Sequence, residues 1–397
     1  LLLEGNETVD LSIGSVSGPG ASIGAQSSHP ITIVDDEIVQ VQFVLNGAST
    51  PEAVSTEIIG LELVALPGVA VGSGVSVTAT VADAATGTAT SGSDHVAFGS
   101  QTVVFGAGAV GGDVQSVNLG LLDDLIIEGD EDVDLSITAV TGPGASAGAQ
   151  PNHQITILDN DFAQIEFVLP ASSVLEPIPV EIVDLQLVGV PGVSIGPGVF
   201  VTADVFDTGS GSATSGADYP VFGIQTAVFG PGTLIGDTQP ILTGILDDLL
   251  LEGLETFELS IGTVTGPGVS TGAQSAHQVS IIDDEVVSVQ FSLSGSSTPE
   301  TAPTEIIALE LVAAPGVTIG PGVVVTADVA DGGTGSSTST VDHTAFGIQT
   351  VTFIAGASAG DVQTVSLGVI DDLVLEGPET VDLSLTSVNG PGASPGP

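Results

Sequence analysis

Five carboxylates fall within nine residues in the stretch DDLIIEGDE, which begins at Asp123. Four of these five carboxylates return at the same spacing in DDLLLEGLE at Asp247 and in DDLVLEGPE at Asp371. The chain carries 49 Asp and Glu residues, no Lys or Arg and five His, so its formal charge of -49 has no internal counter-charge at neutral pH. The first chemistry that these residues suggest is therefore the binding of cations from solution.

Each full repeat adds acids at three further places: an early Glu, a central Asp and a closing triplet such as DND, which ends at Asp161. These motif positions hold 28 of the 49 acidic residues, so the acid is concentrated. Calcium takes about six to eight oxygen ligands in a tolerant geometry, whereas magnesium keeps its waters and zinc or copper prefers imidazole or thiolate. The eight or nine positions of a full repeat exceed the needs of one ion, so we expect two or more calcium ions with shared ligands.

The alternative is that the acids form only a solvated, solubilising face. Adjacent carboxylates without Lys or Arg repel each other, and gathering them at one place is costly unless a cation binds. The spacing of the acids therefore favours a metal site.

The composition excludes several classes of partner and site. Nucleic acids and anionic membranes are poor partners because their binding relies on Lys and Arg. The chain has no Cys, so neither disulfides nor zinc-thiolate sites are possible, and its apolar runs are too short for a membrane span. Without Lys, Arg, Met or Cys, the chain lacks trypsin-type cleavage points and the easiest oxidation targets. We expect an extracellular or cell-surface protein; inheritance of a biased composition from one ancestral repeat is the alternative explanation.

The acidic blocks are spaced by 124 residues, and no insertion or deletion interrupts this register. That length suits one autonomous domain, so we predict domains arranged in tandem. Division after the acidic triplets gives the C-terminal part of a repeat at 1–37, complete repeats at 38–161 and 162–285, and a repeat without its last strand at 286–397.

Apolar residues alternate with a period of two within each repeat, which is typical of half-buried strands. About seven such runs per repeat are separated by turn signals such as LPGV and TGPG, and no segment predicts a helix. The fold class predicted is all-β, a series of antiparallel sandwiches of immunoglobulin-like type. In the first full repeat the residues expected on inward faces are Val39, Val41, Phe43, Leu45, Val75, Val77, Ala79, Val81, Val133, Leu135, Ile137, Ile155 and Ile157.

The sequence resembles tandem Calx-beta domains, a family of calcium-binding β-sandwiches found in sodium/calcium exchangers, integrin β4 and bacterial surface proteins. The resemblance rests on TATSGSDH with TVVFGAG, then LLDDLIIEGDEDVDLSI, then HQITILDND, in that order and at fixed spacing, and it covers essentially the whole chain. His95 and His343 stand where the family usually has Tyr, as at Tyr219.

The resemblance implies calcium ligands at the matching positions of each repeat. In the first complete repeat these are Glu52, Asp94, Asp123, Asp124, Glu128, Glu131, Asp159, Asn160 and Asp161. In the second they are Glu176, Asp218, Asp247, Asp248, Glu252, Glu255, Asp283, Asp284 and Glu285. The last repeat offers Glu300, Asp342, Asp371, Asp372, Glu376 and Glu379, and the N-terminal part offers Glu4, Glu7, Asp35, Asp36 and Glu37. Gly129, Gly253 and Gly377 lie between the acids, where a positive φ would let the backbone turn round the metal.

We expect no enzymatic activity, because no nucleophile elbow or oriented triad is recognisable and the GPG turns lack the Lys of a phosphate loop. The closing triplets run directly into the next strand, so calcium ions at inter-repeat junctions would stiffen the array into an extended rod. The leading hypothesis is a structural extracellular protein of a filament, sheath or surface layer. An adhesin stalk or cell-surface binding module is the alternative, and a calcium-sensing regulatory region is a weaker third.

The partner expected is the protein itself. Either the chain is a window of a longer continuous array, which we favour, or subunits join head to tail by donation of the strand at residues 26–37.

Overall fold

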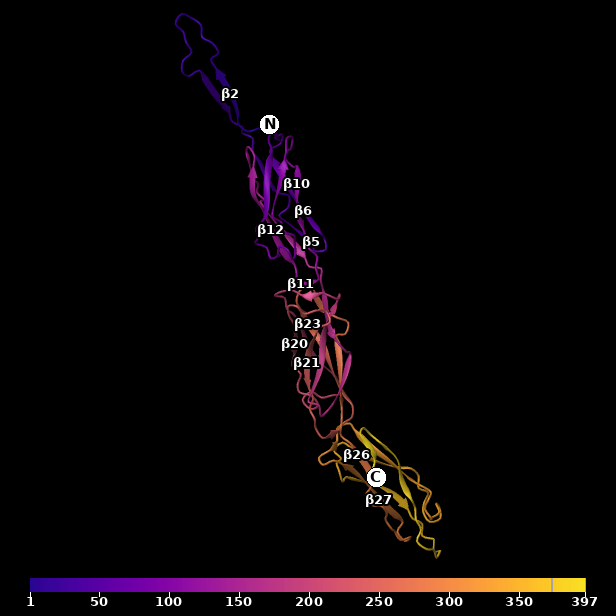
Figure 1. Ribbon diagram of the computed structural model, residues 1–397. Helices are drawn as coiled ribbons and strands as arrows, with labels where there is room; N and C mark the ends of the chain where they lie inside the picture. Colours follow the sequence, from indigo (N-terminus) through magenta and orange to yellow (C-terminus); the bar gives the residue numbers. More distant parts are fainter. Residues whose placement is uncertain (373, 397) are drawn as a thin grey trace.

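The computed structural model describes residues 1–372 and 374–396, and within these ranges every regular element is a β-strand. Three sandwiches follow one another along an extended rod, and a hairpin projects beyond the first of them (Figure 1). The prediction of tandem all-β sandwiches is therefore confirmed. In the described part of the chain there is no helix of the length and apolarity needed to cross a membrane.

The first sandwich pairs a four-stranded sheet with a five-stranded one. The strand order of the first sheet is β10 (Val114–Gly120), β6 (Thr56–Ala65), β4 (Val39–Phe43) and β13 (Ala145–Ala147). The order of the second is β5 (Gly47–Pro51), β14 (Asn152–Leu158), β12 (Glu131–Thr141), β8 (Val77–Asp83) and β9 (Ser100–Phe105). Pairing is antiparallel except for β4 with β13 and β5 with β14.

The second sandwich repeats this topology strand for strand. Its sheets are β21 (Thr238–Gly244), β17 (Val180–Gly189), β15 (Ala163–Phe167) and β24 (Val269–Thr271), and β16 (Ala171–Leu175), β25 (Ala276–Ile282), β23 (Glu255–Thr265), β19 (Val201–Gly211) and β20 (Gln225–Phe229).

The third sandwich keeps the four-stranded sheet but has a smaller partner. The sheets are β31 (Val362–Gly368), β27 (Thr304–Ala313), β26 (Val287–Phe291) and β33 (Ala393–Pro395), and β30 (Gln349–Ile354), β29 (Val324–Asp331) and β32 (Leu383–Asn389). Counterparts of β5 and β14 are absent from its described residues. The projecting hairpin consists of β2 (Glu7–Ser12) and β3 (Ser28–Ile33), whose residues are all exposed.

The core of each sandwich lies between its two sheets and is formed by inward residues of the alternating strands. Val39, Val41 and Phe43 are at most 1% exposed, which confirms the inward face predicted for this segment. Leu45 is 60% exposed, so its predicted inward position is wrong. The reason is that β4 ends at Phe43, and the chain then turns to cross to the opposite sheet as β5.

The remaining predicted inward positions of this repeat are buried except at two sites. Val75 precedes β8 and packs only partly buried against the core. Ile137 is also only partly buried, because a register shift between Ile137 and Ala139 bends β12 at this point. Fully buried in agreement with the prediction are Val77, Ala79, Val81, Val133, Leu135, Ile155 and Ile157.

Three short parallel pairs join successive units and belong to neither sandwich alone. They are β1 (Leu2–Leu3) with β7 (Ala70–Val71), β11 (Ile126–Ile127) with β18 (Ser194–Ile195), and β22 (Leu250–Leu251) with β28 (Thr318–Ile319). In each pair the first strand comes from one repeat and the second from the next. The apolar residues within the DDxxxEG blocks therefore contact the following repeat.

Candidate metal centre

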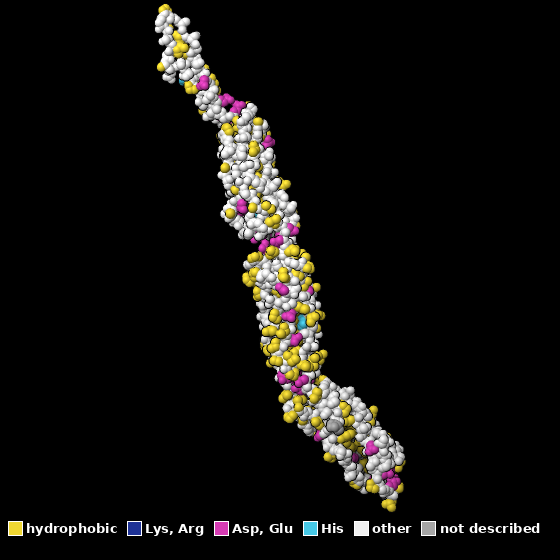
Figure 2. All heavy atoms as spheres, viewed as in Figure 1, with side chains coloured by type: hydrophobic (Ala, Val, Ile, Leu, Met, Phe, Trp, Pro, Cys, Tyr) yellow, Lys and Arg dark blue, Asp and Glu magenta, His cyan; other side chains and the backbone are white. Residues whose placement is uncertain are grey.

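Acidic side chains gather at the junctions between sandwiches (Figure 2). The topology explains this placement. Because β5 and β14 run parallel, their C-terminal ends reach the same tip of the sandwich, and the backbone N–H of Glu52 donates a 3.0 Å hydrogen bond to the carbonyl of Leu158. The loop that carries Asp94 and the block between β10 and β12 arrive at this tip as well, since the N–H of Leu122 donates to the carbonyl of Asp94 at 3.0 Å.

Two groups of three carboxylates form at the tip of the first sandwich. Within each group one oxygen of every member lies within 4.8 Å of the others. The groups are Glu52 with Asp124 and Asp161, and Asp94 with Glu128 and Glu131. Glu52, Asp94 and Asp161 are each 8% exposed, so three of the six carboxylates are nearly withdrawn from solvent.

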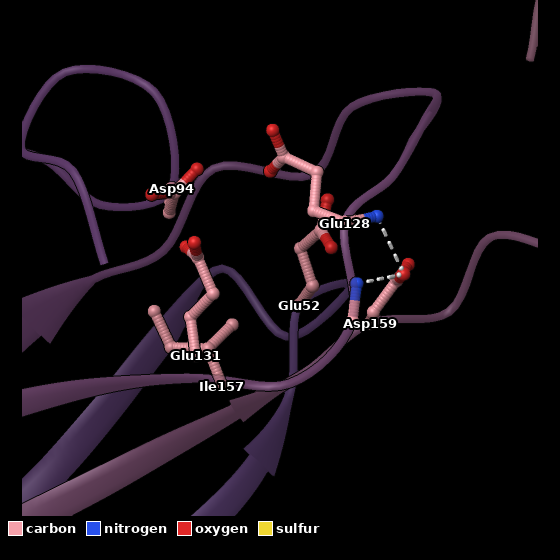
Figure 3. Close-up of a pocket in the computed structure, with 7 residues that line it drawn as sticks. Glu52, Asp94, Glu128, Glu131, Ile157 and Asp159 are labelled. Carbon is pink, nitrogen blue, oxygen red and sulfur yellow. Dashed lines mark hydrogen bonds between the residues drawn. The ribbon is translucent and has the colours of Figure 1, made fainter. Parts of the chain in front are cut away.

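Backbone amides hold the turn that carries the ligands. Asp159 Oδ2 accepts hydrogen bonds from the N–H of Glu128 at 3.0 Å and from the N–H of Gly129 at 2.8 Å (Figure 3). Gly129 has φ of 86°, a left-handed conformation that favours glycine, as predicted. The same pair of bonds recurs at Asp283 with Glu252 and Gly253, and at Asp35 with Glu4 and Gly5.

Gly253 also has a positive φ, of 94°. Gly377 does not, so the predicted conformation is wrong at that position.

Crowding and burial raise the pKa values of these acids. Burial raises the pKa of Glu52 to about 7. Burial, followed by a hydrogen-bonding contact with the Asp94 carboxyl, raises the pKa of Glu131 to about 8. At the second tip the pKa values of Glu176 and Glu252 rise to about 7, and that of Glu255 rises to about 8, with burial again the largest cause. A bound cation would reverse these shifts by stabilising the ionised forms.

Two of the buried carboxylate oxygens have no hydrogen-bond partner among the described residues: Oδ2 of Asp161 and Oε2 of Glu285. Both residues are 8% exposed and occupy corresponding places in their repeats. Buried polar atoms in native proteins are nearly always hydrogen-bonded or bound to an ion, so these two oxygens indicate a missing partner. Because both belong to groups of three carboxylates, a cation is the partner that fits.

The second tip is built in the same way with one change. Asp218 groups with Glu252 and Glu255, as expected from the first tip. The other group consists of Glu176, Asp284 and Glu285. Asp248 is the residue equivalent to Asp124 of the first tip, but Asp284 takes its place in this group. At the first tip the residue equivalent to Asp284 is an amide, and its Nδ2 donates a 2.8 Å hydrogen bond to Oδ1 of Asp123.

Among its described residues the third sandwich forms one group of three, Asp342 with Glu376 and Glu379, and has no counterpart of the group that contains Glu52. Glu376 and Glu379 are exposed. Glu300 is also exposed and joins no group among the described residues, because no counterpart of the β5 and β14 pair holds it at the tip.

The remaining predicted ligands lie at or near these tips, but they join no group of three in the part of the chain that the structure describes. Those near the tips of the sandwiches are Asp123, Asp159, Asp247, Asp248, Asp283, Asp371 and Asp372. The predicted ligand Asn160 donates a hydrogen bond from its Nδ2 to Asp123. Those beside the projecting hairpin are Glu4, Glu7, Asp35, Asp36 and Glu37, of which only Asp35 and Glu37 are partly buried.

The position that varies between His and Tyr is a core position in all three sandwiches. Tyr219, His95 and His343 are 2%, 1% and 3% exposed. Tyr219 stacks on Phe257 with ring centroids 4.2 Å apart and donates a 2.7 Å hydrogen bond to Oδ2 of Asp207. The exchange of residue type therefore leaves the burial of the position intact.

The donor set fits calcium better than other biological metals. Every side chain in the groups of three supplies carboxylate oxygen, which suits a hard cation with a flexible coordination number. The chain has no Cys, and no His belongs to any group formed by the described residues, so the ligands that zinc or copper prefers do not enter these groups.

Comparison with known proteins identifies the family of the chain. The model of the Calx-beta domain family matches residues 34–161, 200–285 and 282–394. No curated protein matches the chain. Among solved structures, CBD12 from CALX1.2 is 16% identical with a TM-score of 0.28, and the match covers 61% of this chain and 99% of that one. The calcium binding domain CBD12 of CALX1.1 is 16% identical with a TM-score of 0.29, covering 60% and 99%. The apo-form Calx CBD1 domain is 21% identical with a TM-score of 0.26, covering 32% and 100%. The family model matches most of the chain's length, in three segments. The chain therefore belongs to the Calx-beta domain family as a tandem repeat protein.

Proposed function

We propose that this protein is a structural component outside the cell, a filament, sheath or surface-layer protein whose repeats are stiffened by calcium. The observation that carries the proposal is the pair of buried oxygens without partners, Asp161 Oδ2 and Glu285 Oε2, within carboxylate groups at the ends of the first two sandwiches. Calcium ions held there would replace the missing partners and neutralise acids that the chain itself cannot neutralise.

The first tip would hold calcium through Glu52, Asp124 and Asp161 and through Asp94, Glu128 and Glu131, and the second through the corresponding groups. Bound calcium supplies positive charge that lets these carboxylates stay ionised side by side. The chain's own contribution is to fix the ligands: the Asp159 and Asp283 carboxylates orient the turns, and the paired ends of β5 and β14, or of β16 and β25, carry the early Glu to the tip.

An extended arrangement of sandwiches without flexible linkers supports a mechanical role. The same rod also suits an adhesin stalk whose recognition domain lies outside this sequence. The proposed partners are further units of the same repeat, either in a longer chain or in another copy. Electron microscopy of native material separates the two roles, since regular polymers support the filament and single stalks capped by a distinct domain support the adhesin.

The decisive experiment for calcium-dependent stiffening combines melting with small-angle X-ray scattering, with and without calcium. We expect calcium to raise the melting temperature and to keep the maximum dimension of the particle long, because ligand binding to the folded, docked state stabilises it by mass action. An unchanged melting temperature and an unchanged particle length after treatment with EDTA would refute the proposal.

A further inference from the structure

The segment between the two pairs of ligands in each acidic block leaves its own sandwich. β11 pairs with β18 of the next repeat, where the N–H of Ser194 donates to the carbonyl of Leu125 at 3.0 Å and the N–H of Gly196 donates to the carbonyl of Ile127 at 2.9 Å. The corresponding bonds at the next junction, from Thr318 and Gly320, are each 2.9 Å long. The backbone of one repeat thus extends the structure of the next.

The side chain of Ile127 completes the hydrophobic core of the second sandwich. It is 0% exposed and packs with the core of residues 162–285, although it belongs to the preceding repeat. Leu3 and Leu251 hold the equivalent positions, are also 0% exposed, and belong to the cores of the first and third sandwiches. We refer to Leu3, Ile127 and Leu251 as the plug residues.

The core of the first sandwich does not use the segment that carries Ile127. Its members nearest in sequence are Leu121 and Val133, which flank that segment. Withdrawal of Ile127 would therefore leave a cavity in the second sandwich and none in the first.

Each plug residue is covalently adjacent to a proposed ligand. Glu128 follows Ile127 directly, and its Cγ would lie 2.6 Å from a Cβ at position 196, so only glycine admits this close approach. The same relation holds for Glu252 with Gly320 at 2.6 Å, and for Glu4 with Gly72 at 2.7 Å. The ligand side chain and the plug residue are thus seated together against the next sandwich.

We propose that each acidic tip is a cation-controlled latch on the following sandwich, with Ile127 and Leu251 as the parts that open or close it. The proposal rests on the proposed function, because it takes the tip to bind calcium. Without a cation, repulsion among the carboxylates is relieved by displacing residues 123–128, since Glu52, Asp94 and Asp161 are buried on the sandwich itself. That displacement withdraws Ile127, so loss of calcium at one tip destabilises the next sandwich toward the C-terminus.

Tyr219 provides a reporter for the second sandwich. It is the only Tyr in a chain without Trp, and it is buried in that core, so its fluorescence reports the unfolding of residues 162–285. The test variant Asp94→Glu with Glu131→Asp moves two ligand oxygens of the first tip but keeps their negative charge, so it weakens calcium binding there without relieving the repulsion. In the presence of calcium, we expect the midpoint of thermal unfolding that Tyr219 fluorescence reports to fall by at least about 5 °C. Neither substituted residue lies in the second sandwich.

A second set of variants tests the plug residue directly. Ile127→Ala lowers the Tyr219 midpoint by a similar amount, and Ile127→Leu, which introduces the residue found at positions 3 and 251, restores it. In the Ile127→Ala background the double substitution at the first tip has little further effect on Tyr219, because the coupling residue is already lost. Ile127→Val replaces Ile127→Ala if the alanine variant leaves Tyr219 exposed at all temperatures.

The latch is overturned if disabling the first tip leaves the Tyr219 midpoint unchanged, or if it lowers that midpoint equally in the Ile127→Ala background. Titration of the unmodified protein with calcium chloride separates this outcome from failure of the proposed function. If calcium binding is not saturable, the proposed calcium role itself is wrong. If binding is saturable but the Tyr219 midpoint is the same with and without the substitutions at the first tip, only the latch is wrong.

Discussion

Glu52 and Asp124 are 72 residues apart in sequence, yet Oε1 of Glu52 accepts a 2.7 Å hydrogen bond from the backbone N–H of Asp124. The equivalent bond from Asp248 to Glu176 is 3.2 Å long. In each of the first two sandwiches, one buried glutamate thus ties the start of the acidic block to the end of β5 or β16. It acts as a ligand in the proposed centre and also positions its neighbours.

Substitution of this glutamate tests its place in the centre. We expect Glu52→Gln to weaken calcium binding at the first tip by at least about tenfold, equivalent to about 1.4 kcal/mol, because a charged ligand is lost while its shape is kept. Glu57→Gln, in β6 and outside the carboxylate groups, serves as the matched control and should bind normally. Isothermal titration calorimetry measures both. Equal affinities in the two variants would remove Glu52 from the centre.

The stability of the calcium-free protein should fall as pH rises. Glu52 and Glu131 have pKa values of about 7 and about 8 in the fold, above their ordinary value of 4.5. Their contribution is fully present below pH 4.5, where folded and unfolded chains are both protonated, and it is lost as pH rises through the folded values. We therefore expect the melting temperature, after removal of calcium on a chelating resin, to decrease between pH 5 and about pH 8. A melting temperature that rises over this interval would contradict the assignment.

Calcium binding near neutral pH should release protons. At pH 7 a carboxyl with a pKa of about 8, such as Glu131 or Glu255, is largely protonated, and a bound cation displaces that proton. We expect at least about one proton per tip at pH 7 and none at pH 9.5, where these groups are already ionised. Calorimetry in two buffers with different ionisation enthalpies measures the number. An apparent binding enthalpy that is independent of the buffer at pH 7 would exclude this linkage.

The sequence was sufficient to predict much of this arrangement. Alternation of apolar residues predicted the buried faces of β4 and β8, because side chains on a strand point to opposite faces in turn. Concentration of the acids at a few motif positions predicted that they share cations as ligands. In the second sandwich the central Asp218 lies together with Glu252 and Glu255 of the acidic block, in agreement with that prediction.

Other features depended on contacts that periodicity does not encode. Ile127 stands between acids in a segment too short to alternate, so nothing in its own repeat indicates that it lies in the core of the next. Leu45 continues an alternating run beyond the point where the strand ends, and a local pattern cannot mark that end. Glu300 matches the motif, but its placement depends on strand pairing that the described part of the third sandwich lacks.

A natural difference between repeats provides the last prediction. In the second sandwich, His277 is buried, its Nδ1 lies 2.7 Å from the carbonyl oxygen of Leu169, and its Nε2 lies 2.9 Å from Oγ of Ser172. In the first sandwich, Nε2 of His153 has no partner within the part of the chain that the structure describes, because Ala48 stands where the second repeat has Ser172. A buried nitrogen without a partner destabilises the fold.

We therefore expect Ala48→Ser to stabilise the first sandwich by about 1 kcal/mol, which corresponds to a few degrees in melting temperature. The reverse change, Ser172→Ala, should destabilise the second sandwich by about 1 to 3 kcal/mol, because it leaves Nε2 of His277 unpaired. Differential scanning calorimetry measures the first effect and Tyr219 fluorescence the second. Ser173→Ala, at an exposed neighbouring position of β16, is the control and should change stability little. If the Ser172→Ala and Ser173→Ala variants melt at the same temperature, the contact between Ser172 and His277 does not stabilise the second sandwich. Ala48→Ser should then not raise the stability of the first sandwich either.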